Sequence, residues 1–238
     1  MTTPKTPAPQ PKPAEIIERL DIYKVRLVRE AVSALALFEV WDGLNEDTTR
    51  RRAVKASPVH KAIDVMWRAT MDTLILTLVR SLEGFRGSVH ATHKVSFQVV
   101  RKLLDEPGVL DLLVDRAKHN AGPAPARAKG QAVLEAAARL RSNVDRLASE
   151  SPSRIRRLQE IRHRYLAHQL HVTDPLDPPE YESIGEIANE VLSLAEHTTR
   201  ILEPTAIEWP RGELAAATAR LIKVIAERFP TAAHVSGD

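Results

Sequence analysis

The chain has 238 residues, enough for one large domain or for one domain with appendages. Hydrophobic residues make up 43% and charged residues 27%, as in ordinary globular proteins, while aromatic residues, at 4%, are too few for a surface that stacks the bases of a single strand. The 34 basic residues barely exceed the 31 acidic ones, so the total charge of +3 does not by itself indicate a nucleic-acid binder.

Both ends of the chain are predicted to be loose tails, and a long helix follows the first of them. Residues 1–13 hold five prolines among Thr, Lys, Ala and Gln, a composition typical of a disordered or polyproline-II segment. Residues 230–238 form the second tail. Between Glu15 and Trp41, apolar residues recur at helical spacing, and Gly43 then provides a stop.

Three helices are predicted before the middle of the chain. Ser57-Pro58 is typical of a helix start, and this helix extends to about Glu83. Weaker signals favour helices near residues 92–105 and 108–120. The run of Ala, Gly and Pro over residues 121–126 then indicates a break.

Four more helices are predicted after this break. Residues 133–147 carry one narrow apolar seam, and a Ser-Pro pair then begins a helix over about residues 153–170. Ser183 and Glu186 form a capping box at the start of the next helix, and the last helix covers about residues 211–229.

These elements predict an all-α protein, an up-and-down bundle of long antiparallel helices with extra helices around it. We expect a single domain over residues 14–229, between the two tails. The chain has no cysteine, no apolar stretch that could span a bilayer and no signal-peptide core at its start. Together these features lead us to expect a cytoplasmic protein.

The predicted helix over residues 153–170 is strongly basic. Glu160 is the only acid between residues 154 and 164, which contain five arginines: Arg154, Arg156, Arg157, Arg162 and Arg164. Guanidinium groups match phosphate oxygens in fork geometry and stay charged at any biological pH, so this face would attract a polyanion. The alternative is a solvated helix face whose charges pair with acids elsewhere.

His168 continues the apolar stripe of this helix, which also contains Ile155, Leu158, Ile161 and Tyr165. A histidine on the packing face would be partly desolvated, and desolvation favours the neutral imidazole that a general base needs. The alternative is a histidine that only fills a core or an interface.

The spacing of Arg162 and His168 has a consequence for assembly. On a straight α-helix the two residues lie about 120° apart around the axis and about 9 Å apart along it, so one helix presents them loosely. Arg164 and His168, four residues apart, share a face. Because a two-fold axis repeats the same patch, two copies could bring four groups to one cleft, and we expect a homodimer through this helix.

Residues 162–168, Arg-His-Arg-Tyr-Leu-Ala-His, resemble the signature of the HEPN superfamily of α-helical domains. That signature is an arginine, a polar residue and a histidine after four to six intervening residues. The pattern is similar to that of the abortive-infection (type U) branch. In that branch an upstream helix often ends in an arginine followed by a short polar turn, as residues 76–83 do around Arg80. Some family toxins carry a tyrosine two residues after the histidine, where this chain has Leu170.

The resemblance implies a metal-independent endoribonuclease that forms a dimer along the motif helix. Such enzymes occur in toxins and phage-defence systems. His168 would be the catalytic histidine, Arg162 would hold the phosphate and His163 would orient the site, with Tyr165 in support. The RNA 2′-hydroxyl would attack its neighbouring phosphate and leave a 2′,3′-cyclic phosphate. Further RNA contacts would come from the other arginines of the helix: Arg154, Arg156, Arg157 and Arg164. No cofactor is expected, and whether an antitoxin partner exists stays open.

Two other interpretations of the same basic face also stay open: a non-catalytic helical module that binds RNA or a protein, and a purely structural bundle. A metal site is not expected, because His90 and His93 have no carboxylate at ligand spacing beside them. The run Arg50-Arg51-Arg52 is interpreted as a surface turn or as an additional RNA contact.

Overall fold

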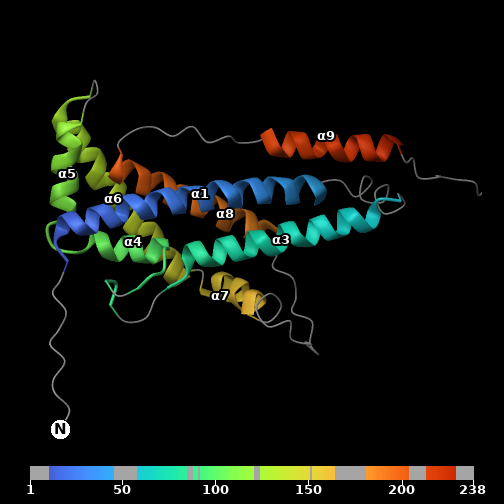
Figure 1. The fold of residues 1–238 in the computed structure, drawn as a ribbon, viewed down its shortest axis with the longest axis horizontal. Coiled ribbons are helices and arrows are strands. Elements are labelled where there is room, and N and C mark those ends of the chain that lie inside the picture. Colours follow the sequence, from blue (N-terminus) through green and yellow to red (C-terminus); the bar gives the residue numbers. More distant parts are fainter. Residues whose placement is uncertain are drawn as a thin grey trace, which may run out of the picture. The chain divides into compact units, whose positions relative to one another are not determined.

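The computed structural model describes residues 11–45, 58–84, 88–90, 92–120, 124–150, 152–163, 181–203 and 213–228. Within these ranges the chain forms helices joined by turns and contains no strand (Figure 1). The all-α prediction is therefore confirmed. Among the helices in these ranges, none combines the length and the apolar character that a membrane crossing requires.

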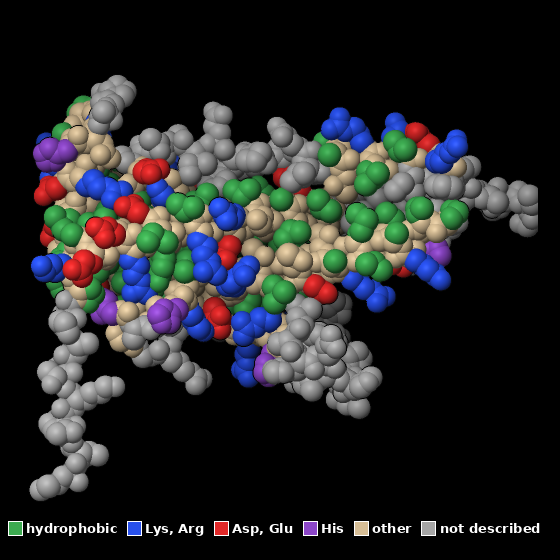
Figure 2. All heavy atoms as spheres, viewed as in Figure 1, with side chains coloured by type: hydrophobic (Ala, Val, Ile, Leu, Met, Phe, Trp, Pro, Cys, Tyr) green, Lys and Arg blue, Asp and Glu red, His purple; other side chains and the backbone are tan. Residues whose placement is uncertain are grey.

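Each predicted helix corresponds to a helix of the structure. In chain order they are α1 (Pro13–Asn45), α3 (His60–Leu82), α4 (Phe97–Leu104), α5 (Val109–His119), α6 (Ala126–Glu150), α7 (Pro152–Ile161), α8 (Tyr181–Leu202) and α9 (Glu213–Arg228). Figure 2 shows acidic and basic side chains interspersed on the face in view, in keeping with the small net charge.

Proline opens two of these helices. Pro13 occupies the first position of α1, where its fixed φ suits a helix and its missing N–H costs no hydrogen bond. Glu15 Oε2 then accepts a hydrogen bond of 3.2 Å from the backbone N–H of Lys12, as the acidic residue of a capping box does. Pro152 occupies the equivalent position in α7. Ser57 lies outside the described residues, and Pro58 lies in the turn before α3.

The predicted capping box at Ser183 is wrong. α8 begins at Tyr181, so Ser183 is already inside the helix. A capping residue must have non-helical backbone angles to present its oxygen to the first free amides, and Ser183 has no such role here.

Contacts along the chain divide it into two compact units. Unit 1 comprises Met1–Val28, Leu82–Glu150 and Ser193–Ala206, and unit 2 comprises Arg29–Ser81, Ser151–Leu192 and Ile207–Asp238. The single domain expected over residues 14–229 stays a prediction. Helices α1 and α8 contribute residues to both units.

In unit 1, α6 packs against α4 and α5. The predicted apolar seam of α6 faces this core, because none of its members is more than 2% exposed: Val133, Ala137, Leu140, Val144 and Leu147. Gly130 lets α6 approach α5 closely, since a Cβ at this position would lie 3.2 Å from Val114 Cγ1. Arg139 lies on the exposed side of α6.

In unit 2, buried side chains come from α1, α3, α7 and α8. Ile184, Ile187 and Val191 of α8 are almost fully buried, as their three-four spacing predicted. Gly185 lies on the same helix against the ring of Phe38 from α1, and a Cβ there would lie 2.7 Å from Phe38 Cζ. The short helix α7 contributes Leu158 and Ile161 to the buried side chains of this unit.

Candidate functional site

The helix α7 carries most of the described candidate residues. Leu158 is 1% exposed, Ile161 is also buried, and Ile155 is half-buried, so these three residues form the apolar stripe that the sequence predicted. Because this stripe packs inward, the arginines between its members lie toward the surface. Arg154 and Arg156 are exposed, and Arg157 is half-buried.

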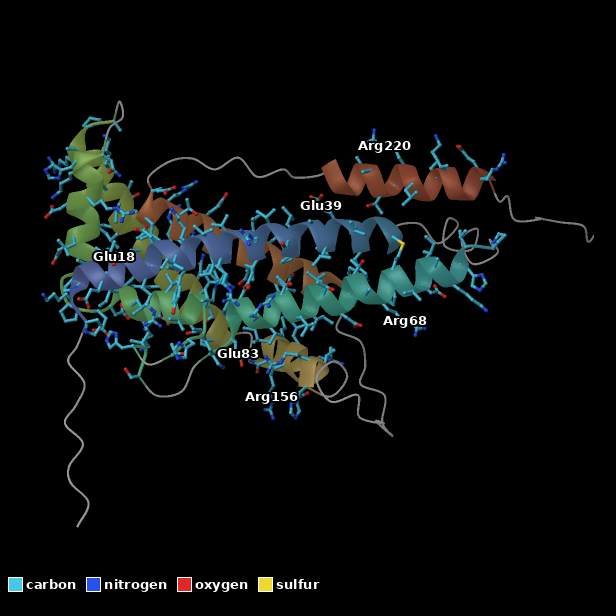
Figure 3. All side chains as sticks on the ribbon, in the orientation of Figure 1. Glu18, Glu39, Arg68, Glu83, Arg156 and Arg220 are labelled. Atoms are coloured by element: carbon cyan, nitrogen blue, oxygen red, sulfur yellow. The ribbon has the colours of Figure 1, made fainter. Side chains whose placement is uncertain are left out.

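Arg156 is more accessible than Arg154, the other arginine of α7 whose partner is known. Its side chain is 79% exposed and projects outward from α7 (Figure 3). Its Nε lies 3.3 Å from Oε1 of Glu160, one turn further along the same helix. An exposed ion pair of this kind contributes only about 0–1 kcal/mol, so a phosphate can replace the carboxylate at little cost.

Arg154 is engaged across helices rather than along one. Its Nη1 forms an ion pair with Oε2 of Glu186 on α8, and both side chains are about half exposed. The pair joins α7 to α8 within unit 2. An RNA phosphate at Arg154 would compete with this carboxylate.

The two motif residues that the structure describes, Arg162 and His163, do not continue α7 as a regular α-helix. α7 ends at Ile161, and both residues have π-helical geometry. Arg162 is half-buried, His163 is exposed, and both side chains take part in interactions within the molecule. The regular α-helical geometry of α7 therefore does not extend to these two residues. Turns of this type occur frequently at functional sites.

The remaining predicted site residues lie outside the described part of the chain. They are Arg164, Tyr165 and the candidate catalytic histidine His168. The run Arg50-Arg51-Arg52 also lies outside it. Of the predicted site residues, Arg154, Arg156, Arg157, Arg162 and His163 are therefore the ones whose surroundings the structure gives, and α7 with its π turn brings these five to one short segment.

Arg80, which the resemblance singled out on the upstream helix, forms a polar cluster with α1. Its Nε lies 3.0 Å from Oε1 of Glu30, and the hydroxyl of Ser81 donates a hydrogen bond of 3.2 Å to Oε2 of the same carboxylate. Glu30 and Ser81 are buried, whereas Arg80 is half exposed. A buried carboxylate needs such partners, so this cluster fixes the end of α3 against α1.

The spacing of His90 and His93 suggests a weak metal pair at most. Nε2 of His90 lies 3.1 Å from Oε1 of Glu106, and Arg19 donates hydrogen bonds to the backbone carbonyls of His90 and Thr92. Across the described residues, no three His, Cys, Asp or Glu side chains come together as a metal site would require. These contacts link His90 to Arg19 of α1 and to Glu106 in the turn between α4 and α5.

His197 on α8 is buried and does not belong to the site residues predicted from the sequence. It is 8% exposed, and its pKa is lowered, first by burial and then by the charges of Arg139 and Arg200. The sequence spacing does indicate that His197 is buried, because it follows the buried Leu194 by three residues and therefore lies on the same side of the helix. Arg139 lies on a different helix, α6, so the sequence alone could not associate it with His197.

The chain is similar to a known protein family. A family model described as AbiU2, of the HEPN type, matches residues 17–219, which is most of the chain and includes the whole segment from Arg162 to His168. Neither the comparison with curated proteins nor that with solved structures gave a match.

Proposed function

Since the chain belongs to the HEPN AbiU2 family, we propose that it is an abortive-infection effector that cleaves RNA without a metal ion. The observation that carries the proposal is the family match across a segment that holds an arginine, a polar residue and a histidine in the order and spacing of the motif: Arg162, His163 and His168. The exposed arginines of α7 support it, because they offer phosphate contacts beside that segment.

The proposed chemistry is an attack within the RNA strand. The imidazole of His168 takes the proton of a ribose 2′-hydroxyl, and the O2′–P bond forms as the P–O5′ bond breaks. The leaving 5′-oxygen takes up a proton and becomes a hydroxyl, so the products are a 2′,3′-cyclic phosphate and a 5′-hydroxyl end. The guanidinium of Arg162 stabilises the negative charge that develops on the phosphorus oxygens, and His163 orients the site.

The proposal includes a homodimer through the motif helix, because a two-fold axis would bring two copies of Arg162 and His168 to one cleft. We further propose that the enzyme acts on cellular RNA in the cytoplasm. Arg154, Arg156, Arg157 and Arg164 would guide the strand toward the dimer, with Tyr165 supporting the motif helix. Arg156 needs less rearrangement than Arg154, since its guanidinium is more exposed and its carboxylate partner lies on its own helix.

Cleavage of single-stranded RNA by the purified full chain in the presence of EDTA tests this proposal. We expect the wild type to cut RNA and leave DNA of the same sequence intact, because DNA lacks the attacking hydroxyl. Mass spectrometry of the products should find 2′,3′-cyclic phosphate ends. His168→Ala should abolish cutting without changing the helical circular dichroism spectrum.

Two other outcomes would replace the proposal. If wild type and His168→Ala bind RNA equally and neither cuts it, the chain is a binding module that uses the basic face of α7. If neither protein binds RNA at low or at moderate salt, the arginines form a solvated structural face.

A further inference from the structure

Positive charge is concentrated where α5 ends and α6 begins. Residues 116–134 contain no Asp or Glu, whereas the whole chain has a net charge of only +3. Their four basic side chains are Arg116, Lys118, Arg127 and Lys129. Arg116 is occupied within unit 1, because its guanidinium lies 2.8–3.0 Å from the carboxylate of Asp21 on α1. We call the other three residues, Lys118, Arg127 and Lys129, the basic tip.

Contacts between α5 and α6 hold the basic tip together. The side chain of Lys118 crosses from α5 to α6, because a Cβ at Gly130 would lie 3.2 Å from Lys118 Cε. In the opposite direction, Nζ of Lys129 donates a hydrogen bond of 2.6 Å to the backbone carbonyl of Asn120, at the end of α5. Arg127 lies in the same first turn of α6 as Lys129. The two helices pack against each other in unit 1 (Figure 1), so the three cations lie at one end of this helix pair.

The basic tip is accessible to another molecule. Lys118 and Arg127 are exposed, and Lys129 is half-buried. Nζ of Lys118 lies 2.9 Å from Oδ1 of Asp115, and these two side chains are 42% and 61% exposed. An ion pair this exposed is weak, so a phosphate can replace the carboxylate of Asp115 at little cost.

The basic residues at the start of α6 do not stabilise that helix. The N-terminal end of a helix dipole is positive, so acidic side chains there stabilise a helix and basic side chains oppose it. The first turn of α6 has no acidic residue and contains Arg127 and Lys129. A partner outside the helix gives these two cations a role that the helix itself does not.

The side chains of this region fit a polyanion better than a protein surface. Among the described residues from Lys118 to Gln131, no large apolar side chain is exposed. A protein interface usually has an apolar core inside a polar rim, which this region therefore lacks. Lys and Arg side chains are the usual contacts of nucleic-acid phosphates, and such contacts position a strand without reading its bases.

We propose that Lys118, Arg127 and Lys129 bind the phosphodiester backbone of single-stranded RNA, as a second contact surface besides the motif helix. The basic tip belongs to unit 1, whereas α7 belongs to unit 2. The choice of RNA as the polyanion rests on the proposed function, whereas the affinity for phosphate rests on the charges of the tip. Because the contacts are to phosphates, binding at the tip is independent of base sequence.

RNA binding tests the basic tip without relying on cleavage. The probe is a fluorescent single-stranded RNA with 2′-O-methyl groups, which offers phosphates but has no free 2′-hydroxyl to attack. Anisotropy gives its dissociation constant for the full chain over a range of salt concentrations. The neutral-tip variant, Lys118→Gln/Arg127→Gln/Lys129→Gln, should lose roughly tenfold in affinity at low salt. The slope of log affinity against log salt should become smaller by about two, because each phosphate contact to a single strand contributes about 0.7. The loss should be the same for two RNAs of unrelated sequence.

A charge-preserving variant separates the effect of charge from that of structure. Lys118→Arg/Arg127→Lys/Lys129→Arg changes the same three side chains and keeps their charges, so its affinity should stay within about threefold of the wild type. A loss as large as that of the neutral-tip variant would overturn the proposal. Arg127→Gln alone, at an exposed position, should reduce the salt slope by about 0.7 and repeats the test with Lys118 and Lys129 in place.

A second control removes three charges from another helix. Arg220→Gln/Lys223→Gln/Arg228→Gln changes exposed residues of α9 and removes as much charge as the neutral-tip variant does. Its affinity should stay within about threefold of the wild type, with the salt slope unchanged, because distant exposed charges are screened. Equal losses of affinity and slope in the α9 variant and the neutral-tip variant would overturn the basic tip.

The failure of the tip is distinguishable from failure of the nuclease. If the neutral-tip variant loses affinity but the wild type leaves unmodified RNA intact, the tip stands and the proposed cleavage does not. If the wild type cuts unmodified RNA and the neutral-tip variant binds the methylated RNA as tightly as the wild type does, cleavage stands and the tip does not. A wild type that does not bind the methylated RNA would also overturn the tip. Displacement of the RNA by polyglutamate at an equal concentration of charges would overturn RNA as the partner and indicate an acidic protein.

Discussion

Arg154 of α7 forms an ion pair with Glu186 of α8, so one of the proposed RNA contacts is already occupied by a carboxylate of the same unit. Both side chains are about half exposed, and a pair in such a position stabilises the fold by at most about 1 kcal/mol. The pair has a larger effect on the binding of a polyanion, because Glu186 both occupies the guanidinium and reduces the local positive potential.

Glu186→Gln should therefore strengthen RNA binding while hardly changing stability. We expect affinity for an uncleavable RNA to rise about two- to fivefold at low salt, with the gain disappearing as salt screens the charges. Glu227→Gln on α9 removes the same charge from an exposed pair with Lys223 and is the control. Anisotropy titrations of both variants decide the matter, and a gain of equal size in both would mean that Arg154 is not an RNA contact.

Gly185→Ala should destabilise the protein. The added Cβ would lie 2.7 Å from Cζ of the Phe38 ring, a distance that real contacts do not reach, so the ring or the helix must shift. Overpacking of this kind costs about 1–3 kcal/mol. Gly84→Ala is the control, because a Cβ at Gly84 meets no atom within 4 Å. Urea unfolding measures both, and Phe38→Leu in the Gly185→Ala background should recover part of the loss. Equal midpoints for the two alanine variants would contradict the packing described.

Leu158→Ala should loosen α7 from its unit. Leu158 is 1% exposed, and truncating a buried leucine to alanine typically costs about 2–5 kcal/mol through lost burial and the cavity that remains. Arg156→Ala, two residues away on the exposed side, should change the free energy of unfolding by no more than about 0.5 kcal/mol. Far-UV circular dichroism during urea unfolding distinguishes the two, and a small effect of Leu158→Ala would mean that α7 is not packed as described.

The sequence predicted the helices because their signal is local. The apolar spacing within a single helix predicts which side of it is buried, as in the seam from Val133 to Leu147 and the stripe from Ile155 to Ile161. Ser183 shows the limit of this signal: a Ser-x-x-Glu pattern also occurs inside a helix, and only the backbone distinguishes the two cases. The all-α class could thus be predicted, and helix ends less reliably.

Much of the candidate site could not be predicted, because it depends on residues far apart in the chain. Glu186 lies beyond a long connection from Arg154, and Arg139, whose charge lowers the pKa of His197, lies on a different helix from that histidine. Neither relationship leaves a periodic trace in the sequence. The π turn at Arg162 also escaped prediction, because periodicity assumes an uninterrupted helix.

His197 should make the protein less stable in acid. Its folded-state pKa is lowered, chiefly by burial and also by Arg139 and Arg200, whereas in the unfolded chain it titrates near its ordinary pKa of about 6.5. The unfolded chain then binds the proton more readily, so protonation favours unfolding. The stability associated with the neutral ring is present above about pH 6.5 and is lost as the pH falls below this value toward the folded-state pKa.

Comparison with His197→Gln isolates this contribution. Glutamine is polar but does not titrate, so the variant should lose less stability than the wild type between pH 7.5 and pH 5, an interval chosen to span the ordinary pKa of about 6.5. Thermal unfolding at several pH values measures the difference. Parallel curves for the two proteins would show that His197 titrates alike in the folded and unfolded states.

Arg162→Ala should relieve toxicity in a host cell. If Arg162 stabilises the charge on the phosphorus oxygens, its removal lowers the cleavage rate by about 10²–10³-fold, the range found when one transition-state donor is removed. Wild type should arrest growth on induced expression, and Arg162→Ala should not. Arg162→Lys should restore little, because an ammonium cannot reproduce the two parallel hydrogen bonds of a guanidinium. Arg220→Ala, on the exposed side of α9, is the control and should remain toxic. Equal growth with wild type and Arg162→Ala, at matched protein levels, would count against a toxin whose activity depends on this arginine.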